Sequence, residues 1–578
     1  MEKRLLMVFV TLLLTALTVQ AVPAKPGVKK TVKLADGSTI ELTLRGDEHY
    51  SYYTDASGAP FQIEKGIARK ITPEEVTTQW TARKRANLNR AAASRRAGSI
   101  TRRIGEPSAS TTGTHMGLVV LLEFQDVKFT TPNVRETYQR VFNEADYHEG
   151  GMAGSVRDYF LKQSYNQLTI DFDVVGPYTV NEVEKYYGEP IRDEETGEVK
   201  YHDRDPSYAI VEALDQAVED ESLNFADYDW DGDGVVDQVF FIFAGYSEAQ
   251  GADENTIWPH ESTLIGNGWD FYLEDDEGNR LLVFDTYACA SELCDDGKPD
   301  ENGNIAAVMD GIGTACHEFS HCMGLPDMYD TDLSGGFGMS YWDIMDQGSY
   351  IDNARTPAGY SSYERWFSGW LEPVEIKEMT SINDMKPLAT YPEAYVLYNE
   401  ATEKSIKGEY YLLENRQNVD FDAKLNGHGL MIIHVDYDRE MWTNNEVNDD
   451  PDHQRLTIIP ADGELSEASK EALAGDLWPG YKKNTALTNT TTPAAELFNP
   501  NVDGRKLMSK PIEDITEDVD AKTVSFLACR PIADKIDAIV TNSTDTPRYY
   551  DLQGREVPAD TKGLLIRKLG SSVEKVTH

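Results

Sequence analysis

The feature that most constrains this chain is the pattern HExxHxxGxxD, which begins at His317 and ends at Asp327. If residues 307–323 form a helix, side chains four positions apart leave the same face, so the imidazoles of His317 and His321 lie one turn apart. A catalytic zinc ion takes three protein ligands and keeps one position open for water. The two histidines are therefore predicted to supply two of the three ligands.

The residues around this histidine pair indicate the rest of the site. Gly324 is predicted to end the helix and turn the chain back toward the metal, because glycine adopts the left-handed conformation at little cost. Asp327 is then the candidate third ligand, although Asp330 and Asp332 lie close by in the sequence and keep that assignment open. Glu318 is placed to accept a proton from the zinc-activated water without binding the metal, which predicts a general base for peptide hydrolysis.

A second element follows about twenty residues later, where segment 341–346 reads YWDIMD. It resembles the turn of metzincin-type peptidases, in which a methionine, here Met345, forms an apolar floor beneath the zinc. Taken alone, Met345 is equally well explained as a core methionine. An isolated HExxH arises by chance in roughly one chain in a hundred of this composition, and the added glycine and aspartate make chance a much poorer explanation.

These motifs resemble those of the immune inhibitor A family of secreted metallopeptidases. The resemblance spans about residues 35–530 and implies a zinc-dependent peptidase. Metzincin relatives usually carry a third histidine at the position of Asp327, and an aspartate there is similar to the variant in small secreted peptidases with the same motif. The matching segments are 154–160, 175–178, 257–260, 317–330, 342–346, 409–417 and 429–436.

The amino-terminal residues 1–21 have the pattern of a secretory signal peptide. Lys3 and Arg4 precede the apolar stretch 5–17, and a small-residue cleavage site ends at Ala21. No later segment contains eighteen uninterrupted apolar residues, so no membrane span is predicted. We expect the mature protein to be secreted and to lie outside the cell or on its surface.

Charge is divided unevenly along the chain. Residues 1–103 contain 18 Lys and Arg against 9 Asp and Glu, a net charge of +9, whereas the remainder contains 36 basic and 90 acidic residues, a net charge of −54. Residues 22–103 are therefore interpreted as a basic pro-segment that covers an acidic body in a zymogen. Its first part is predicted to be rich in strands and its arginine-rich second part to be helical. A permanent amino-terminal domain is the alternative.

The expected activation site follows the pairs Arg95-Arg96 and Arg102-Arg103, which precede the loose Ser/Thr/Gly segment 107–114. An activating protease of the trypsin type would cut such a segment easily and leave a mature start between Ile104 and Gly117. A cysteine cannot block the zinc, because residues 1–110 contain none. Asp47 or Glu48 is the alternative group for that role, and the sequence does not choose between them.

A candidate second metal site lies in segment 227–237, DYDWDGDGVVD. Oxygen ligands at alternate positions, with glycines that permit a tight turn, are typical of a calcium loop. No glutamate follows at the twelfth position, so the segment is not a complete EF-hand, and a solvated acidic turn is the alternative. The best register for calcium uses Asp229, Asp231, Asp233 and Asp237.

Five cysteines are too few and too unevenly spaced for a disulfide scaffold. Cys289 and Cys294 are candidates for one small disulfide-closed loop, which export would permit. Cys316 and Cys322 flank the histidines at a spacing that is too far round a straight helix for pairing, and are expected to be buried thiols.

The overall pattern predicts the α+β class, with a zincin/metzincin-like catalytic domain over residues 114–372. Apolar runs at 116–124 and 238–244 are expected to be strands, and 154–164 and 207–219 are expected to be helices. A small amino-terminal pro-domain, residues 22–103, would precede it, and residues 373–530, with short alternating strands, would follow as a β-sandwich-like domain. Other candidates for substrate contact or polar sites are Tyr341, Tyr350, His260, His434, Asp436 and His453, for most of which a structural role is the simpler reading.

The carboxyl-terminal residues 531–578 form a separate segment after a linker-like stretch. Their sequence resembles the sorting segments of proteins exported by type IX-like systems, which would place the protein outside a Gram-negative bacterium. An ordinary terminal hairpin is the alternative.

Two functions from different classes fit these observations. The first is a secreted zinc endopeptidase, made as a zymogen, that acts on protein or peptide substrates. The second is a calcium-stabilised extracellular binding or adhesion protein with a non-catalytic metal site. Glu318 favours the first, because a binding module needs no base beside the metal. A serine hydrolase has no GxSxG support, no nucleic-acid partner is expected, and an aminopeptidase or amidase with similar zinc chemistry stays open.

Overall fold

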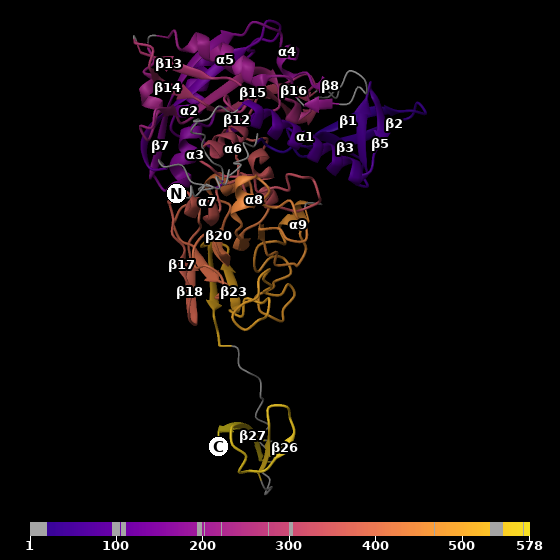
Figure 1. Cartoon of the computed structure of the whole chain (residues 1–578), viewed down its shortest axis with the longest axis vertical. Coiled ribbons are helices and arrows are strands. Elements are labelled where there is room, and N and C mark those ends of the chain that lie inside the picture. The colour runs from indigo at the N-terminus through magenta and orange to yellow at the C-terminus, as the bar shows by residue number, and fades with distance from the viewer. Residues whose placement is uncertain are drawn as a thin grey trace, which may run out of the picture. The chain divides into compact units, whose positions relative to one another are not determined.

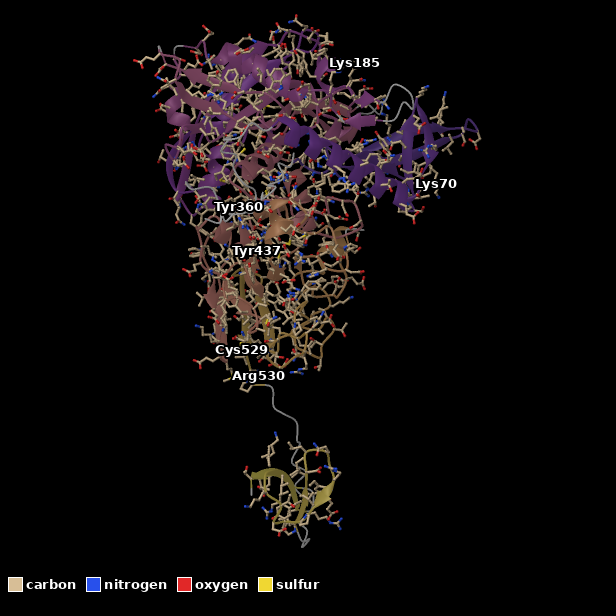
Figure 2. All side chains as sticks on the ribbon, in the orientation of Figure 1. Lys70, Lys185, Tyr360, Tyr437, Cys529 and Arg530 are labelled. Carbon is tan, nitrogen blue, oxygen red and sulfur yellow. The ribbon has the colours of Figure 1, made fainter. Side chains whose placement is uncertain are left out.

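A computed structural model describes residues 20–94, 105, 111–192, 199–201, 203–220, 222–275, 277–299, 305–466, 469–531, 547–569 and 572–577. The chain forms two compact units, Met1–Cys529 and Arg530–His578, and Figure 2 labels the two residues at which one unit ends and the other begins. Among the described residues, no helix has the length and apolar character needed to span a bilayer. The predicted signal peptide lies outside the described residues, apart from Gln20 and Ala21.

The amino-terminal part is a small closed barrel followed by a long helix, α1 (Pro73–Ser94) (Figure 1). Thr72 and Glu75 start the helix with reciprocal hydrogen bonds between each side chain and the other residue's backbone N–H, at 3.1 and 2.7 Å. The barrel encloses a small apolar core around Leu42 and Phe61. Its strands are β1 (Lys29–Leu34), β2 (Thr39–Gly46), β3 (Ser51–Thr54), β4 (Pro60–Glu64) and β5 (Ile67–Lys70).

A six-stranded sheet forms the centre of the next part and has the order β12-β15-β11-β6-β7, with β16 beside β15. Its four long strands run parallel, whereas β12 and β16 are antiparallel to β15. The predicted strands 116–124 and 238–244 correspond to β6 and β11. The strands are β6 (Gly113–Glu123), β7 (Leu168–Thr179), β11 (Val239–Tyr246), β12 (His260–Thr263), β15 (Thr286–Pro299) and β16 (Ile305–Met309).

Alternate residues of the central strands enter two different cores. Val119 and Leu121 of β6 pack in one core with α2 (Val134–Asn143), α3 (Val156–Gln163) and α6 (Gly313–Cys322). Leu118 and Val120 pack in the other with α5 (Pro206–Ala217). The sheet is therefore covered on both faces, which explains its continuous apolar strands. The helices predicted at 154–164 and 207–219 correspond to α3 and α5.

One predicted helix is shorter than expected. The sequence suggested a helix over 307–323, but residues 305–309 form strand β16, and α6 begins at Gly313. Leu293 of β15 pairs with Met309, so backbone groups that a helix would satisfy are used by the sheet. The helix propensity of the two alanines in this segment is overridden by that tertiary pairing.

The β-rich part after residue 373 contains a five-stranded sheet, β17-β19-β20-β21-β22, and a three-stranded sheet, β18-β24-β23. Leu413 and Ile432 share a core with Val524 of the second sheet. Leu412 and Ile433, which point the other way, belong to the core that contains α6, so the two parts are joined by continuous apolar packing. The strands are β17 (Val374–Glu375), β18 (Thr380–Met385), β19 (Tyr395–Tyr398), β20 (Glu409–Arg416), β21 (Gly429–Asp436), β22 (Leu456–Ile458), β23 (Ile512–Asp518) and β24 (Thr523–Ala528).

Shorter elements complete the first unit. They are α4 (Glu184–Gly188), β8 (Ile191–Arg192), β9 (Val199–Tyr201), β10 (Val235–Val236), β13 (Phe271–Glu274), β14 (Arg280–Phe284), α7 (Ser362–Phe367), α8 (Arg439–Thr443) and α9 (Lys470–Leu473). The second unit is a four-stranded sheet of order β26-β25-β27-β28. Its strands are β25 (Arg548–Tyr550), β26 (Glu556–Val557), β27 (Leu564–Leu569) and β28 (Ser572–Thr577).

The predicted disulfide is absent, because all five cysteines are free thiols. Cys289 and Cys294 both lie in the single strand β15. Five residues of extended strand span about 16 Å, far beyond the Cα separation of up to about 7 Å that a disulfide allows. Cys316 and Cys322 are buried thiols, as expected.

Candidate metal centre

Helix α6 carries the two histidines, and every one of its residues is buried. The Nε2 atoms of His317 and His321 lie 3.1 Å apart. Their Nδ1 atoms lie 2.7 and 2.8 Å from the backbone carbonyls of Ile344 and Leu325. These carbonyl bonds fix the proton on Nδ1 and leave both Nε2 atoms as lone-pair donors that face each other, which is the arrangement of paired metal ligands.

Asp327 completes a triangle of donor atoms with this pair. Its Oδ1 lies 3.1 Å from Nε2 of His317 and 3.4 Å from Nε2 of His321. Ligands about 2.0–2.1 Å from a single tetrahedral zinc ion are about 3.3–3.4 Å from one another, so the three atoms fit one such ion. The chain reaches Asp327 through Gly324, whose φ of +96° turns it at the end of α6.

The side chain of Asp327 is oriented by a residue of the β-rich part. Asn445 donates from Nδ2 to Oδ2 of Asp327 at 2.6 Å and accepts from the Asp327 backbone N–H at 2.7 Å. The amide thus occupies one carboxylate oxygen and directs the other toward the histidines. Both residues are buried, so this double contact holds the candidate ligand in place without competition from water.

Electrostatics differ among the three candidate ligands. Burial lowers the pKa of His317. Burial also opposes protonation of His321, but the charge and hydrogen bond of Asp327, together with the charge of Glu318, raise the pKa of His321 to about 9. Burial opposes ionisation of Asp327, but the neighbouring histidines, His321 foremost, lower its pKa to about 2. Asp327 is therefore a carboxylate that a cation, either imidazolium or metal, stabilises.

Glu318 lies beside this triangle and shares its buried environment. One ligand atom from each of Glu318, His317 and His321 falls within 4.8 Å of the other two. Burial raises the pKa of Glu318 well above its usual value. Its Oε1 accepts a hydrogen bond from the backbone N–H of Val22 at 2.8 Å, and Oε2 has no hydrogen-bond partner among the described residues. One oxygen of the carboxylate thus bonds the amino-terminal segment, and the other has no hydrogen-bond partner among the described residues.

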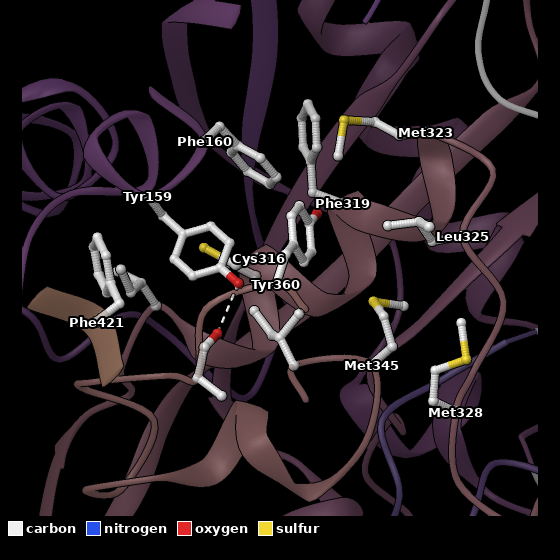
Figure 3. Close-up of a cluster of buried hydrophobic side chains, with 14 of the residues drawn as sticks. Tyr159, Phe160, Cys316, Phe319, Met323, Leu325, Met328, Met345, Tyr360 and Phe421 are labelled. Carbon is white, nitrogen blue, oxygen red and sulfur yellow. Dashed lines mark hydrogen bonds between the residues drawn. The ribbon is translucent and has the colours of Figure 1, made fainter. Parts of the chain in front are cut away.

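Met345 is fully buried in the apolar cluster that supports α6. Figure 3 shows it with Met328 and Leu325 among the side chains that pack with Cys316 and Phe319 of the helix. The backbone ties this layer together, because the carbonyl of Met345 accepts from the N–H of Met328 at 2.8 Å. The segment after the candidate third ligand is therefore held directly against the methionine turn.

Residues 20–25 of the amino-terminal part pass through the same region. Gln20 forms an antiparallel bridge with Glu261 of the edge strand β12, and the carbonyl of Ala21 accepts from the hydroxyl of Tyr329 at 2.9 Å. The carbonyl of Val22 accepts from Nε1 of Trp258 at 3.0 Å. Ala21 and Val22 are fully buried. This segment covers the candidate centre in the manner of a bound extended peptide.

Of the two acidic candidates for blocking the metal, Asp47 has a structural role. Its carboxylate accepts from Nε1 of Trp80 at 2.7 Å and from the backbone of His49 at 2.8 Å. Glu48 is buried, and its Oε2 has no hydrogen-bond partner among the described residues. Burial, then the charges of Asp47, Asp327 and Glu318, raises the pKa of Glu48 well above its usual value, so Glu48 faces the same acidic region.

The family model described as the immune inhibitor A peptidase M6 catalytic domain matches residues 109–370. Residues 109–370 are thus similar to an M6 catalytic domain. The resemblance inferred from the sequence is therefore confirmed, and the match contains His317, Glu318, His321 and Asp327.

Two kinds of relatives support the M6 assignment. Pre-pro-metalloprotease PrtV of Vibrio cholerae serotype O1 is 26% identical over 310 residues, which are 46% of this chain and 31% of PrtV. Immune inhibitor A of Bacillus thuringiensis subsp. alesti is 26% identical over 319 residues, which are 47% of this chain and 43% of that protein. The chain thus aligns with less than half the length of either relative.

The other aspartates near the M6 centre have separate positions. The Oδ2 atom of Asp330 accepts from the backbones of Gly335 and Gly336 at 2.6 and 2.7 Å. Asp330, Asp332 and Asp449 form a group of their own with oxygens within 4.8 Å. Of the three aspartates that the sequence left open as third ligand, Asp327 is the one beside the histidine pair.

The candidate calcium loop brings together three of its four predicted residues. Oxygens of Asp229, Asp231 and Asp237 lie within 4.8 Å of one another. Asp233 directs Oδ1 to the backbone N–H of Val235 at 2.8 Å. Asp229 accepts from three backbone N–H groups of the loop, so part of its charge is already stabilised by the turn itself.

The remaining polar candidates divide into one contact with the amino-terminal segment and several contacts within the folded parts. Tyr350 donates to the carbonyl of Pro23 at 2.9 Å, so it reaches the segment that covers the candidate centre. His260 is buried between the carbonyl of Trp258 and the hydroxyl of Tyr287. Tyr341 packs against the core of α6. His434 pairs with Glu409 at 3.0 Å and His453 with Asp436 at 2.7 Å, both within the β-rich part.

Three contacting residues went unrecognised in the sequence. Asn445 is 118 residues from the aspartate it orients, and a lone asparagine carries no signal of that role. Trp258 lies within a segment that the family resemblance had included, but without a role. Tyr329 lies two residues after Asp327, just beyond the motif. Its role could have been predicted, since a tyrosine so close to a candidate metal ligand is a candidate hydrogen-bond donor to substrate.

Proposed function

We propose that the protein is a secreted zinc-dependent endopeptidase made as a zymogen. The observation that carries the proposal is the buried triangle of His317, His321 and Asp327 donor atoms, at the spacing one tetrahedral ion requires, beside the carboxylate of Glu318. The M6 match and the relatives described as metalloproteases support the same class of chemistry.

When bound by these three residues, zinc would polarise the scissile carbonyl and lower the pKa of a water molecule toward about 7. Glu318 then acts as general base. Its carboxylate accepts the proton of the attacking water and delivers it to the leaving nitrogen of the peptide. The Val22 N–H, 2.8 Å from Oε1, supports this role because it puts an amide nitrogen at the position to which Glu318 would deliver the proton.

Latency is supported by the contacts of residues 20–25. The segment that begins at Val22 lies against Glu318 and Trp258 and excludes substrate from the same space. Cleavage at the predicted signal site, after Ala21, would give Val22 a free amino group beside the Glu318 carboxylate, which adds an ion pair to the block. Residues 22–103 would then be the inhibitory pro-segment, held by contacts such as the partly buried ion pair between Lys84 and Glu446 at 3.0 Å.

Calcium is proposed at the loop that holds Asp229, Asp231 and Asp237, with Asp233 turning toward the ion when it binds. The role of calcium would be structural. The ion would hold the loop that precedes β11 and would offset repulsion among the acidic residues around it. Millimolar calcium should raise the melting temperature of the wild type, and Asp231→Asn should remove most of that increase. An equal increase in both proteins would exclude this loop as the site.

Residues 531–578 are proposed to direct export to the exterior or surface of a Gram-negative cell. The compact sheet β25–β28 supports a separate module, since it belongs to its own unit. Removal of residues 531–578 should leave the shortened protein inside the cell envelope, and fractionation with immunoblotting would measure this. Normal release of the shortened chain would remove this role.

The central experiment measures zinc stoichiometry together with casein hydrolysis by trypsin-treated protein. One zinc per chain is expected, with hydrolysis abolished by 1,10-phenanthroline and restored by added Zn²⁺. Amino-terminal sequencing should place the processed start between Ile104 and Gly117. Zinc-free protein that still cleaves casein, or zinc-loaded processed protein that does not, would contradict the proposed function.

A further inference from the structure

The carbonyl groups of residues 21–23 each meet a side-chain donor. The carbonyl of Ala21 accepts from Tyr329 and that of Val22 from Trp258, at 2.9 and 3.0 Å. The carbonyl of Pro23 accepts from Tyr350 at 2.9 Å. Upstream, Gln20 and Glu261 exchange backbone hydrogen bonds of 3.1 and 2.6 Å. These contacts fix the register of an extended chain against the edge strand.

In this register the Ala21–Val22 peptide bond occupies the position of the bond that the proposed mechanism would cleave. Its N–H points to Oε1 of Glu318, the group that delivers a proton to the leaving nitrogen in the proposed mechanism. The reacting carbonyl of that peptide is the one of Ala21. In a trans peptide the carbonyl oxygen and the N–H project in opposite directions, so a donor to this oxygen lies across the peptide from Glu318.

The hydroxyl of Tyr329 is that donor. The side chain is 7% exposed, and its position is set by the backbone around it. The preceding residue, Met328, donates its N–H to the carbonyl of Met345 at 2.8 Å and accepts from the N–H of Met339 at 3.2 Å. Two residues before Tyr329 stands Asp327, itself oriented by Asn445. The backbone that carries Tyr329 is therefore fixed relative to the candidate metal centre.

We infer that Tyr329 is a catalytic residue whose hydroxyl hydrogen-bonds the oxygen of the scissile carbonyl and stabilises the negative charge that develops there. The inference rests on the proposed function. Tyr329 keeps its proton throughout, since the proton of the attacking water goes to Glu318 and then to the leaving nitrogen. A fixed donor at hydrogen-bond distance strengthens its bond as the oxygen gains charge, and removing one such donor typically costs about 10²–10³-fold in kcat.

Tyr350 provides the matched comparison. Its hydroxyl makes a bond of the same length, but to the carbonyl of Pro23, which lies two peptide bonds downstream of the reacting one and gains no charge. Such a contact binds substrate and transition state about equally, so its loss changes KM and leaves kcat nearly intact. Both tyrosines are buried, and both variants remove one hydroxyl only.

The test compares trypsin-treated wild type, Tyr329→Phe, Tyr350→Phe and Glu318→Gln on one fluorogenic peptide. Tyr329→Phe should lower kcat about 10²–10³-fold with KM within about threefold of wild type. Tyr350→Phe should raise KM several-fold with kcat within about threefold. Zinc content and melting temperature should match the wild type in both. A phosphinic peptide, which imitates the tetrahedral transition state, should lose affinity for Tyr329→Phe by about the same factor as kcat/KM.

The possible results distinguish the role of Tyr329 from the proposed peptidase function. If Glu318→Gln is inactive and Tyr329→Phe keeps kcat within threefold of wild type, the role of Tyr329 is excluded and the peptidase assignment stands. A loss of kcat in Tyr329→Phe without loss of phosphinic-peptide affinity also excludes it, because a disturbed structure and not a missing donor would then be responsible. Full activity of Glu318→Gln would overturn the proposed function itself.

Discussion

The backbone N–H of Val22 lies 2.8 Å from Oε1 of Glu318, although 296 residues separate the two in the chain. The contact brings the amino-terminal segment to the carboxylate that the sequence marks as the base. The neighbouring carbonyls of the same segment accept hydrogen bonds from Tyr329 and Trp258. A single segment thus connects the proposed latency with the proposed geometry of catalysis.

Replacing Glu318 by glutamine should abolish peptidase activity with the fold intact. The amide has nearly the same shape and can still accept from Val22, but it cannot take a proton from water. Turnover of processed enzyme is expected to fall about 10²–10⁴-fold, with zinc content and melting temperature close to wild type. The measurement is casein hydrolysis beside zinc analysis. Turnover above about one per cent of wild type would remove Glu318 from the role of base.

Asn445→Ala should weaken zinc binding without removing a candidate ligand. Asp327 would lose the amide that occupies Oδ2, and with it the orientation of Oδ1. The loss of such an outer contact typically costs about 10–100-fold in metal affinity. Competition with a chromogenic chelator would measure it. Asn448→Ala is the control, because Asn448 is a buried asparagine that bonds backbone carbonyls of Met328 and Leu456 and no candidate ligand. Equal zinc affinity for Asn445→Ala and wild type would contradict the proposed orientation.

Trp80→Ala should loosen the pro-segment. The indole is 4% exposed, packs with Tyr50 and Val76, and donates to Asp47 at 2.7 Å, so its removal is expected to cost about 3–5 kcal/mol of local packing. In a Glu318→Gln background, which prevents self-digestion, trypsin should release the pro-segment faster. Thr81→Ala, a change on the exposed face of the same helix, is the control. Trypsin should release its pro-segment at the wild-type rate. Unchanged release from Trp80→Ala would show that this helix does not hold the segment.

Asp476 should make stability depend on pH. Its buried carboxyl accepts from Nε1 of Trp342 at 2.8 Å, and burial raises its pKa to about 7. Since the folded-state pKa exceeds the unfolded value of about 4, the stability associated with the protonated group is lost as pH rises from about 4 to about 7. Asp476→Asn removes this loss and keeps an acceptor for Trp342. The melting temperature of the variant relative to wild type should therefore be higher at pH 8 than at pH 5. A difference that does not change with pH would rule out the shift.

The local parts of the site followed from the sequence. His317 and His321 leave one face of α6 because helical periodicity acts over four residues, and Gly324 ends the helix because its left-handed φ needs no side-chain space. Burial on both sides of the central sheet likewise follows from the continuous apolar runs of β6 and β11. Each of these features depends on neighbours within a few residues.

Contacts between distant segments were decided by the tertiary structure. The helix expected from residue 307 begins at Gly313, because β15 captures residues 305–309 as a strand. The choice of Asp327 over Asp330 depends on Asn445, which only the packing of the β-rich part brings to the centre. The position of Val22 against Glu318 is set by contacts between remote segments, among them the hydrogen bond from Trp258 to the Val22 carbonyl. Sequence spacing determined which residues are candidate ligands. Buried long-range contacts determined which of these residues lie together, and the sequence does not reveal them because hydrogen bonds and apolar packing between remote segments leave no periodic pattern in the chain.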